Sequence, residues 1–343
     1  PNADGEAGLG DDILNVDITP GSLHHFAITN STPINLTAGN TELISLEGRN
    51  TYNVNVPSDL NRMIYFHASS SQALDEFSLS SGVGWSPISF AVLAKNSSTL
   101  NVYYKPIKSG SRQLIFGDDN NLAQDQNVIN ATANVNIAAG AASRLNIADL
   151  STNLLAGQKS SLATVSLTDS YGNLVDNNQD RTVNLSSSLA SGYFFGANNQ
   201  TTTSVVIPYG QAISSFYYLS TMAGNALVTA ADQEFSATSS VVVDWGDITT
   251  FAIEKEQNTV KAGTSTGPIA VRSVNNYGIT IPFAAETIVN FNSTATSTGF
   301  FDFSQTGLFD GSVISQTLAA GSSTLNLFYK DTKTGVFIKQ IQS

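Results

Sequence analysis

The 343-residue sequence predicts an all-β protein made of three antiparallel β-sandwich domains in tandem. This fold class rests on an internal repeat, a two-residue alternation of apolar and polar side chains, and a composition poor in charged residues. The repeat is marked by Ala-Gly pairs at 38–39, 156–157 and 262–263. A tyrosine followed six positions later by glycine marks each copy again, at Tyr104, Tyr218 and Tyr329. A shared period of about 110 residues indicates an array of similar domains.

Within each repeat, apolar side chains occupy every second position of several segments. The alternation is clear in 100–104, 163–168 and 325–329. Because successive side chains of a strand point to opposite faces, it predicts strands with one buried and one solvent-facing side. Residues 71–76 lack the alternation, and we expect them to form one short helical turn. Everything else in the three repeats is expected to be strand or turn.

The composition narrows the classes of function. Charged residues make up 12% of the chain and the net charge is −12, so no basic stripe is available to neutralise the phosphates of a nucleic acid. There is no cysteine, which excludes disulfides, thiolate nucleophiles and cysteine-ligated metals. No apolar run is long enough to span a bilayer, so we expect no membrane insertion.

The repeat marks set the expected domain boundaries. Residues 1–20 form an N-terminal segment with a stray closing strand; 21–140, 141–245 and 246–343 are the three sandwich domains, the last lacking its closing strand. The connections around Gly140 and Gly246 are too short to be free linkers. We therefore expect an elongated, stiff rod, with Trp245 packed where the second and third domains meet.

The stray strand is identified by a repeated phrase. Asn-Val-Asp-Ile-Thr-Pro-Gly at 15–21 matches Asn-Val-Asn-Ile-Ala-Ala-Gly at 134–140, which closes the first domain. An unpaired sheet edge must be covered or paired, so the segment could insert into the third domain of a neighbouring copy. The expected donor residues are Ile13, Leu14, Val16 and Ile18, and the expected acceptors are Val336, Ile338 and Ile341. Alternatively, the sequence is a window on a longer chain whose next strand completes the sheet.

Turn-forming residues separate the strands at matching places. Asp169-Ser170-Tyr171-Gly172-Asn173 in the second repeat corresponds to Asn275-Asn276-Tyr277-Gly278 in the third, and both contain residues that tolerate positive φ. In the first repeat we place an altered version of this turn at 47–50.

The stretch 155–185 resembles bacterial Ig-like domains of the invasin/intimin type. It contains their Ala-Gly pair at 156–157, the Val-rich strand at 163–168, the Asp-x-x-Gly-Asn-x-Val turn at 169–175 and the strand that follows at 182–185. The resemblance extends less closely to the third repeat and weakly to the first. It implies an Ig-like sandwich fold on the extracellular surface of a prokaryote, in a stalk, an adhesin spacer, or an element of an envelope layer or filament.

Calcium is the one cofactor that the sequence suggests, because this ion takes oxygen ligands from carboxylates, amides and carbonyls. Asp169, Asn173 and Asp176 cluster in one turn, and Asp118 and Asp119 begin another polar loop. The alternative is that these side chains only shape their turns. No other cofactor is expected.

The remaining candidates concern ligands and catalysis. Adjacent aromatic residues at 103–104, 194–195, 217–218 and 300–301 place one ring of each pair outward, where it could meet a surface glycan or simply cover a sheet edge. No nucleophile elbow, phosphate loop or dinucleotide motif occurs, and we expect no enzyme. The favoured function is a structural segment that binds copies of itself or adjoining domains of a longer chain; the rival is a calcium-dependent glycan-binding or adhesion module.

Overall fold

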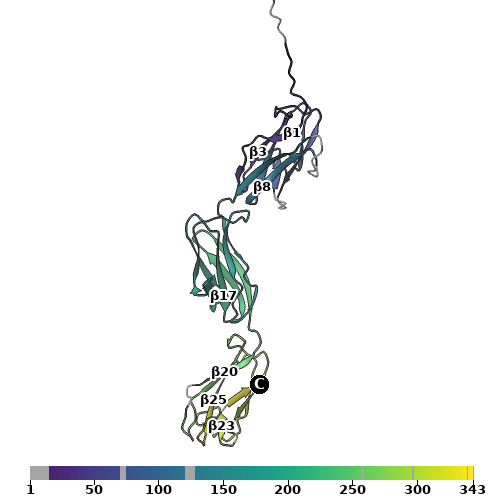
Figure 1. The fold of residues 1–343 in the computed structure, drawn as a ribbon. Helices are drawn as coiled ribbons and strands as arrows, with labels where there is room; N and C mark the ends of the chain where they lie inside the picture. The colour runs from purple at the N-terminus through teal and green to yellow at the C-terminus, as the bar shows by residue number, and fades with distance from the viewer. Residues whose placement is uncertain are drawn as a thin grey trace, which may run out of the picture. The chain divides into compact units, whose positions relative to one another are not determined.

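A computed structural model describes residues 15–69, 75–119, 128–255, 259–295, 297–337 and 339–342 (Figure 1). Every regular element in these ranges is a β-strand, and the strands form six sheets. No helix in the described part of the chain has the length and apolarity to cross a membrane. The chain divides into two compact units, one running to residue 142 and including 168–175, the other holding 143–167 and everything after 175.

The first sandwich packs a four-stranded sheet, β1-β3-β7-β5, against a five-stranded sheet, β2-β9-β8-β4-β6. Its strands are β1 (His25–Ile28), β2 (Ile34–Thr37), β3 (Glu42–Arg49), β4 (Arg62–Ala68), β5 (Asp75–Ser78), β6 (Phe90–Leu93), β7 (Thr99–Pro106), β8 (Gly110–Gly117) and β9 (Ala131–Ala138). The alternation expected for 100–104 is realised, since Val102 and Tyr104 are fully buried in the core between the sheets.

The helical turn expected at 71–76 is wrong for the two residues that the structure describes there. Asp75 and Glu76 begin strand β5, which pairs with β7, while 70–74 lie outside the described residues. The strand is held by Phe77, which packs its ring against Tyr104 with centroids 5.1 Å apart. Asp75 is buried in an ion pair with Arg112. Tertiary pairing thus overrides the weak local preference of this segment.

The second sandwich packs sheet β10-β12-β17-β14-β15 against sheet β11-β19-β18-β13-β16. Its strands are β10 (Arg144–Ala148), β11 (Asn153–Leu155), β12 (Ala163–Thr168), β13 (Arg181–Ser187), β14 (Gly192–Gly196), β15 (Thr201–Thr202), β16 (Ser204–Ile207), β17 (Ile213–Ser220), β18 (Gly224–Ala231) and β19 (Ser236–Asp244). The predicted strand at 163–168 is confirmed, with Val165 and Leu167 buried.

The third sandwich has the sheets β20-β21-β25-β23 and β24-β22-β26. Its strands are β20 (Thr250–Lys255), β21 (Ile269–Val274), β22 (Thr287–Ser293), β23 (Gly299–Asp302), β24 (Ser315–Leu318), β25 (Thr324–Asp331) and β26 (Lys339–Gln342). Its core gathers Val289, Phe291 and Leu327 between the two sheets.

Closing strands have the same place in the first two sandwiches. In each, β9 or β19 runs parallel to β2 or β11 and antiparallel to β8 or β18. In the third sandwich, β26 pairs antiparallel with β22 as β18 pairs with β13. Because β26 is the last strand of its sheet in the described residues, its other side is an open edge.

The expected donor and acceptor residues can now be located in part. Residues 15–24 form no strand, and the side chains of Val16 and Ile18 are 67% and 86% exposed. Val336 is exposed, whereas Ile341 lies in β26 opposite Phe291 and is half-buried. Ile13, Leu14 and Ile338 lie outside the described residues.

Candidate functional site

One turn recurs in all three repeats with the same hydrogen bonds. It begins with Asn50, Asp169 or Asn275, whose Oδ1 accepts the backbone N–H groups two and four residues later. The fourth residue has positive φ in each copy, 63° at Asn53, 77° at Gly172 and 75° at Gly278. We call these the Asn50 turn (50–54), the Asp169 turn (169–173) and the Asn275 turn (275–279).

The position predicted for the first copy of the turn is wrong. Residues 47–49 end strand β3, and the turn starts at Asn50, the last residue of the predicted stretch. The copy was missed because Asn53 stands where the other two repeats have glycine. A signal was present in the sequence: each turn has tyrosine as its third residue, at Tyr52, Tyr171 and Tyr277, and asparagine adopts left-handed φ more readily than most residues.

The Asp169 turn is held by a carboxylate surrounded by N–H donors. Oδ1 accepts from the backbone of Tyr171 and Asn173 at 2.9 Å each. Oδ2 accepts from the Gly140 N–H and from Asn173 Nδ2, at 2.8 Å each. Burial raises the pKa of the Asp169 carboxyl, but the hydrogen bonds from Asn173, Gly140 and Tyr171 outweigh burial and lower that pKa below its ordinary value. Asp169 is therefore a buried anion at neutral pH.

Further contacts fasten this turn within the first compact unit. Asn173 donates through Nδ2 to the Ile107 carbonyl at 2.9 Å and accepts through Oδ1 from the Ser109 N–H at 3.0 Å. Lys108 Nζ donates to the Tyr171 carbonyl at 3.1 Å. The Tyr171 ring lies against Gly39, where an added Cβ would come within 2.5 Å of it. A polar clamp and a glycine contact thus act together.

The Asn275 turn makes the corresponding contacts within the second compact unit, with different chemistry. Asn275 Nδ2 donates to the carbonyls of Ala156, at 2.8 Å, and Trp245, at 2.9 Å. Ile279 stands where the Asp169 turn has Asn173, and it packs on Gly157 in place of forming hydrogen bonds. A Cβ added to Gly157 would lie 2.6 Å from Ile279 Cγ1 and 2.7 Å from Tyr277 Cβ. The backbone carbonyl of Trp245 therefore contributes to this contact.

The Asn50 turn has the same internal hydrogen bonds but different surroundings. Asn50 Nδ2 donates to the Pro20 carbonyl, as Asn275 donates to Trp245. The Tyr52 side chain is 86% exposed, against 38% for Tyr171 and 42% for Tyr277. Thus the first turn is built like the other two, but its tyrosine is much more open to solvent.

Two of the carboxylates proposed to bind calcium, Asp169 and Asp118, have protein partners. Both oxygens of Asp169 are occupied by N–H donors, Asn173 is one of those donors, and Asp176 is exposed. Asp118 pairs with Arg62 at 2.9 Å. No group of three or more histidine, aspartate or glutamate side chains gathers in the ranges that the structure describes. Calcium at Asp169, Asn173 and Asp176, or at Asp118 and its neighbour Asp119, stays a prediction.

The aromatic pairs are mostly turned inward or covered. Tyr104, Tyr218, Phe194 and Phe301 are buried. Lys159 Nζ lies 4.3 Å above the Phe195 ring and 5.5 Å above the Tyr217 ring, so two outward rings are covered by an ammonium group. The two rings face each other across the neighbouring inner strands β14 and β17, so they cover no sheet edge, and the Lys159 ammonium lies over both of them.

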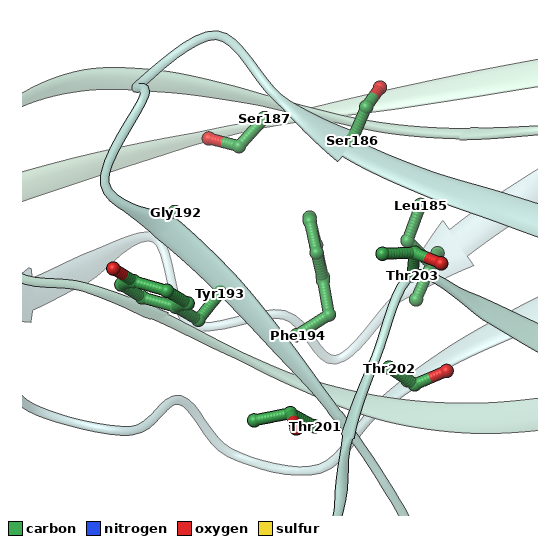
Figure 2. A pocket seen from close by; sticks show the side chains of 9 residues that line it. All are labelled: Leu185, Ser186, Ser187, Gly192, Tyr193, Phe194, Thr201, Thr202 and Thr203. Atoms are coloured by element: carbon green, nitrogen blue, oxygen red, sulfur yellow. The ribbon is translucent and has the colours of Figure 1, made fainter.

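One pocket of about 580 Å³ opens beside this sheet (Figure 2). Figure 2 shows Phe194 between the strands and Tyr193 at the other side of β14, with serine and threonine side chains around them. Its lining residues are Leu185, Ser186, Ser187, Gly192, Tyr193, Phe194, Thr201, Thr202 and Thr203. Tyr193 is half exposed and neutral hydroxyls dominate the lining, so the pocket offers hydrogen bonds but no charge.

Comparisons with known proteins give structural neighbours only. No family model matches the chain, and no curated protein matches it. FdeC, an Escherichia coli adhesin, aligns over 89% of this chain and 92% of its own, with 15% identity and a TM-score of 0.36. The D0-D1 domains of intimin align over 64% of this chain and 97% of their own, with 16% identity and a TM-score of 0.23. Domains 4–9 of the surface-layer protein SbsC align over 93% and 46%, with 14% identity and a TM-score of 0.27.

Proposed function

We propose that this chain is a structural segment of an extracellular prokaryotic surface protein whose copies join head to tail by strand donation. The segment 15–21 of one copy adds along the edge that starts at Gly335 and leads into β26, in the third sandwich of the next copy. The chain then acts as a spacer or filament element and carries out no catalysis. Its neighbours among known structures include an adhesin and a surface-layer protein.

The observation that carries the proposal is the exposure of two apolar side chains in a segment that resembles a closing strand. Val16 and Ile18 are 67% and 86% exposed. Counted back from the glycine that ends each phrase, they match Val135 and Ile137 of β9, which are 0% and 5% exposed. Burying a valine and an isoleucine stabilises a contact by about 1.5–3 kcal/mol each. In the free chain the two side chains stay exposed, so this stabilisation is absent.

The acceptor edge has a definite register. Ile137 of β9 lies opposite Gly110, and Val243 of β19 lies opposite Gly224. Each of these glycines follows the buried tyrosine by six positions, as Gly335 follows Tyr329. A donor that keeps this register would have Ile18 opposite Gly335 of the acceptor, four residues before β26 begins at Lys339. A contact of this head-to-tail kind does not close on itself and grows into a filament.

Sedimentation velocity over a range of concentrations tests the proposal. We expect the chain to form concentration-dependent assemblies, and the double variant Val16→Asp/Ile18→Asp to remain monomeric because charges cannot be buried between the sheets. Asp17→Asn is the matched control, since the side chain between them faces solvent in a closing strand and its change leaves assembly intact. A chain that stays monomeric at every concentration, or a double variant that assembles equally well, would disprove strand donation.

The rival function, calcium-dependent glycan binding or adhesion, has one observation in its favour. The pocket beside Tyr193 combines a half-exposed aromatic ring with hydroxyl groups, the chemistry that sugars meet in proteins. A glycan array probed with and without calcium tests it. This function would be supported over the structural one if the unaltered chain binds a glycan only in the presence of calcium and Tyr193→Ala does not bind it.

A further inference from the structure

The three Ala-Gly turns of the repeats share one geometry. Gly39, Gly157 and Gly263 have φ of 86°, 85° and 86°. Their N–H groups donate to the carbonyls of Pro106 at 2.6 Å, Ser220 at 2.7 Å and Asp331 at 2.6 Å, which are matching places in the repeats. The third turn is therefore formed in the same conformation as the first two.

Only two of the three turns are covered. Gly39 lies under the Tyr171 ring, and Gly157 lies under Tyr277 and Ile279. A Cβ added to Gly263 would meet nothing within 4 Å in the part of the chain that the structure describes. The third sandwich thus carries an open receiving surface, while the Asn50 turn of the first sandwich carries a tyrosine that is 86% exposed.

We propose that the Asn50 turn of one copy docks on the Ala262–Gly263 turn of a second copy of this chain. This inference rests on the proposed head-to-tail assembly and names the surface that fixes it. The contact repeats, between two chains, what the Asp169 and Asn275 turns do within one. The Asn50 turn and the Ala262–Gly263 turn occur on the same polypeptide. The equivalent contacts, of Tyr171 with Gly39 and of Tyr277 with Gly157, are already formed within the two compact units.

Strand donation would bring these two surfaces together. Ala38 donates its N–H to the Ala138 carbonyl, and Ala156 donates to Asp244. Each accepting residue comes two positions before the glycine that follows the closing strand: Ala138 before Gly140, and Asp244 before Gly246. Thr19 has that position before Gly21, so Ala262 of the acceptor copy would donate to Thr19 of the donor. The chain then continues through Pro20, which already holds Asn50.

The chemistry of the contact follows the Asn275 turn and not the Asp169 turn. Asn275 uses its amide hydrogens on Trp245 and Ala156, and Asn50 already uses one on Pro20, leaving the other for the Ala262 carbonyl of the second copy. Val54, 49% exposed, stands at the place of Ile279 and would pack on Gly263. The docked contact is thus neutral and apolar.

Cross-linking between single-cysteine variants tests the docking, because the chain has no cysteine of its own. Thr51→Cys and Thr264→Cys, mixed and treated with a short bismaleimide, are expected to give a cross-linked heterodimer. The double variant Asn40→Cys/Ser170→Cys is the positive reference, since these residues have the same places around the filled contact of Gly39 with Tyr171. Thr51→Cys mixed with Tyr209→Cys, an exposed loop position, measures random encounter. We expect at least a tenfold higher yield for the Thr51–Thr264 pair.

Two further variants separate this inference from strand donation. Tyr52→Ala, added to Thr51→Cys, is expected to lower the cross-linking yield about tenfold while sedimentation still shows assemblies, because donor and acceptor strands are untouched. Ile18→Asp is expected to abolish both. Assemblies with no Thr51–Thr264 cross-link above the Tyr209 level would overturn the docking and leave strand donation standing. The absence of both assemblies and cross-link would overturn the two together.

Discussion

The Asp169 turn and the Asn275 turn have one backbone conformation and fasten it with opposite chemistry. Asp169 is an anion that accepts four N–H groups, including that of Gly140. Asn275 is neutral, accepts two N–H groups and donates to two carbonyls, including that of Trp245. The backbone group that follows the closing strand matches the side chain at the first position of the turn. The Gly140 N–H donates to the Asp169 carboxylate, and the Trp245 carbonyl accepts from the Asn275 amide.

The fifth position of the turn follows the same division. Asn173 forms hydrogen bonds with Ile107 and Ser109, whereas Ile279 packs on Gly157. One contact is therefore electrostatic and polar, and the other is neutral and apolar. Because the backbones match, exchanging side chains between the two turns isolates the contribution of chemistry from that of shape.

The largest effect is expected from Asn275→Asp. The new carboxylate would face the carbonyls of Ala156 and Trp245 in a buried site, so two hydrogen bonds are replaced by repulsion. Leaving a buried charge unpaired costs about 3–5 kcal/mol. Urea unfolding followed by the fluorescence of Trp245, in a Trp85→Phe background, measures the loss. Asn276→Asp, one residue along and exposed, is the matched control and should change the free energy of unfolding by less than about 0.5 kcal/mol.

The reverse exchange, Asp169→Asn, should be milder. The amide keeps one oxygen for the two backbone N–H groups inside the turn and loses the Oδ2 acceptor for Gly140 and Asn173. Asn173 Nδ2 still donates to the Ile107 carbonyl, so the unpaired Gly140 N–H sets the cost at about 1–3 kcal/mol. Equal losses in the two exchanges would mean that the matched backbone, and not the side-chain chemistry, holds both turns in place.

A smaller effect separates Gly157→Ala from Gly263→Ala. Both glycines have nearly the same positive φ, so both variants carry the same backbone strain of about 1 kcal/mol. At Gly157 the new Cβ also meets Ile279 and Tyr277 at distances that force one of them to move. We expect an additional loss of about 1–3 kcal/mol there, as for overpacking in a core. Chemical denaturation of the two variants below the concentration of assembly measures the difference; no difference would mean that Gly157 is not in close contact.

The sequence and the structure agree where the signal is local and periodic. Alternation at 163–168 predicts strand β12 correctly, and the alternation at 100–104 and 325–329 predicts the buried faces on which Tyr104 and Tyr329 lie. These features depend on which face of a strand is buried, and a period of two records that directly.

The features that the sequence could not supply depend on partners distant along the chain. The sequence suggests Asp169 as a calcium ligand but does not reveal its partner Gly140, because the two residues are 29 positions apart and only the fold brings them together. The Asn50 turn was misplaced because Asn53 substitutes for glycine, a difference that a pattern of glycines cannot detect. Strand β5 was missed because pairing with β7, and not local preference, makes it a strand.

The smallest effect concerns pH, and only the Asp169 turn should show it. Hydrogen bonds to the ionised carboxylate hold the pKa of Asp169 below its ordinary value of 3.8, so the unfolded chain binds its proton at a higher pH than the folded one does. The stabilisation is therefore fully present above the ordinary value and is lost as the pH falls through the lowered pKa. Hydrogen-exchange protection of the Gly140 amide, which donates to this carboxylate, should fall over that range.

The Asn275 turn supplies the internal control for this measurement. The Ile279 amide donates to Asn275 Oδ1 at 3.1 Å, an acceptor that does not titrate, so its protection should stay constant over the same range of pH. In Asp169→Asn, protection of the Gly140 amide should be low at every pH. Equal acid sensitivity at Gly140 and Ile279 would mean that the sandwiches loosen as wholes in acid, and the contrast between a charged and a neutral fastening would lose its basis.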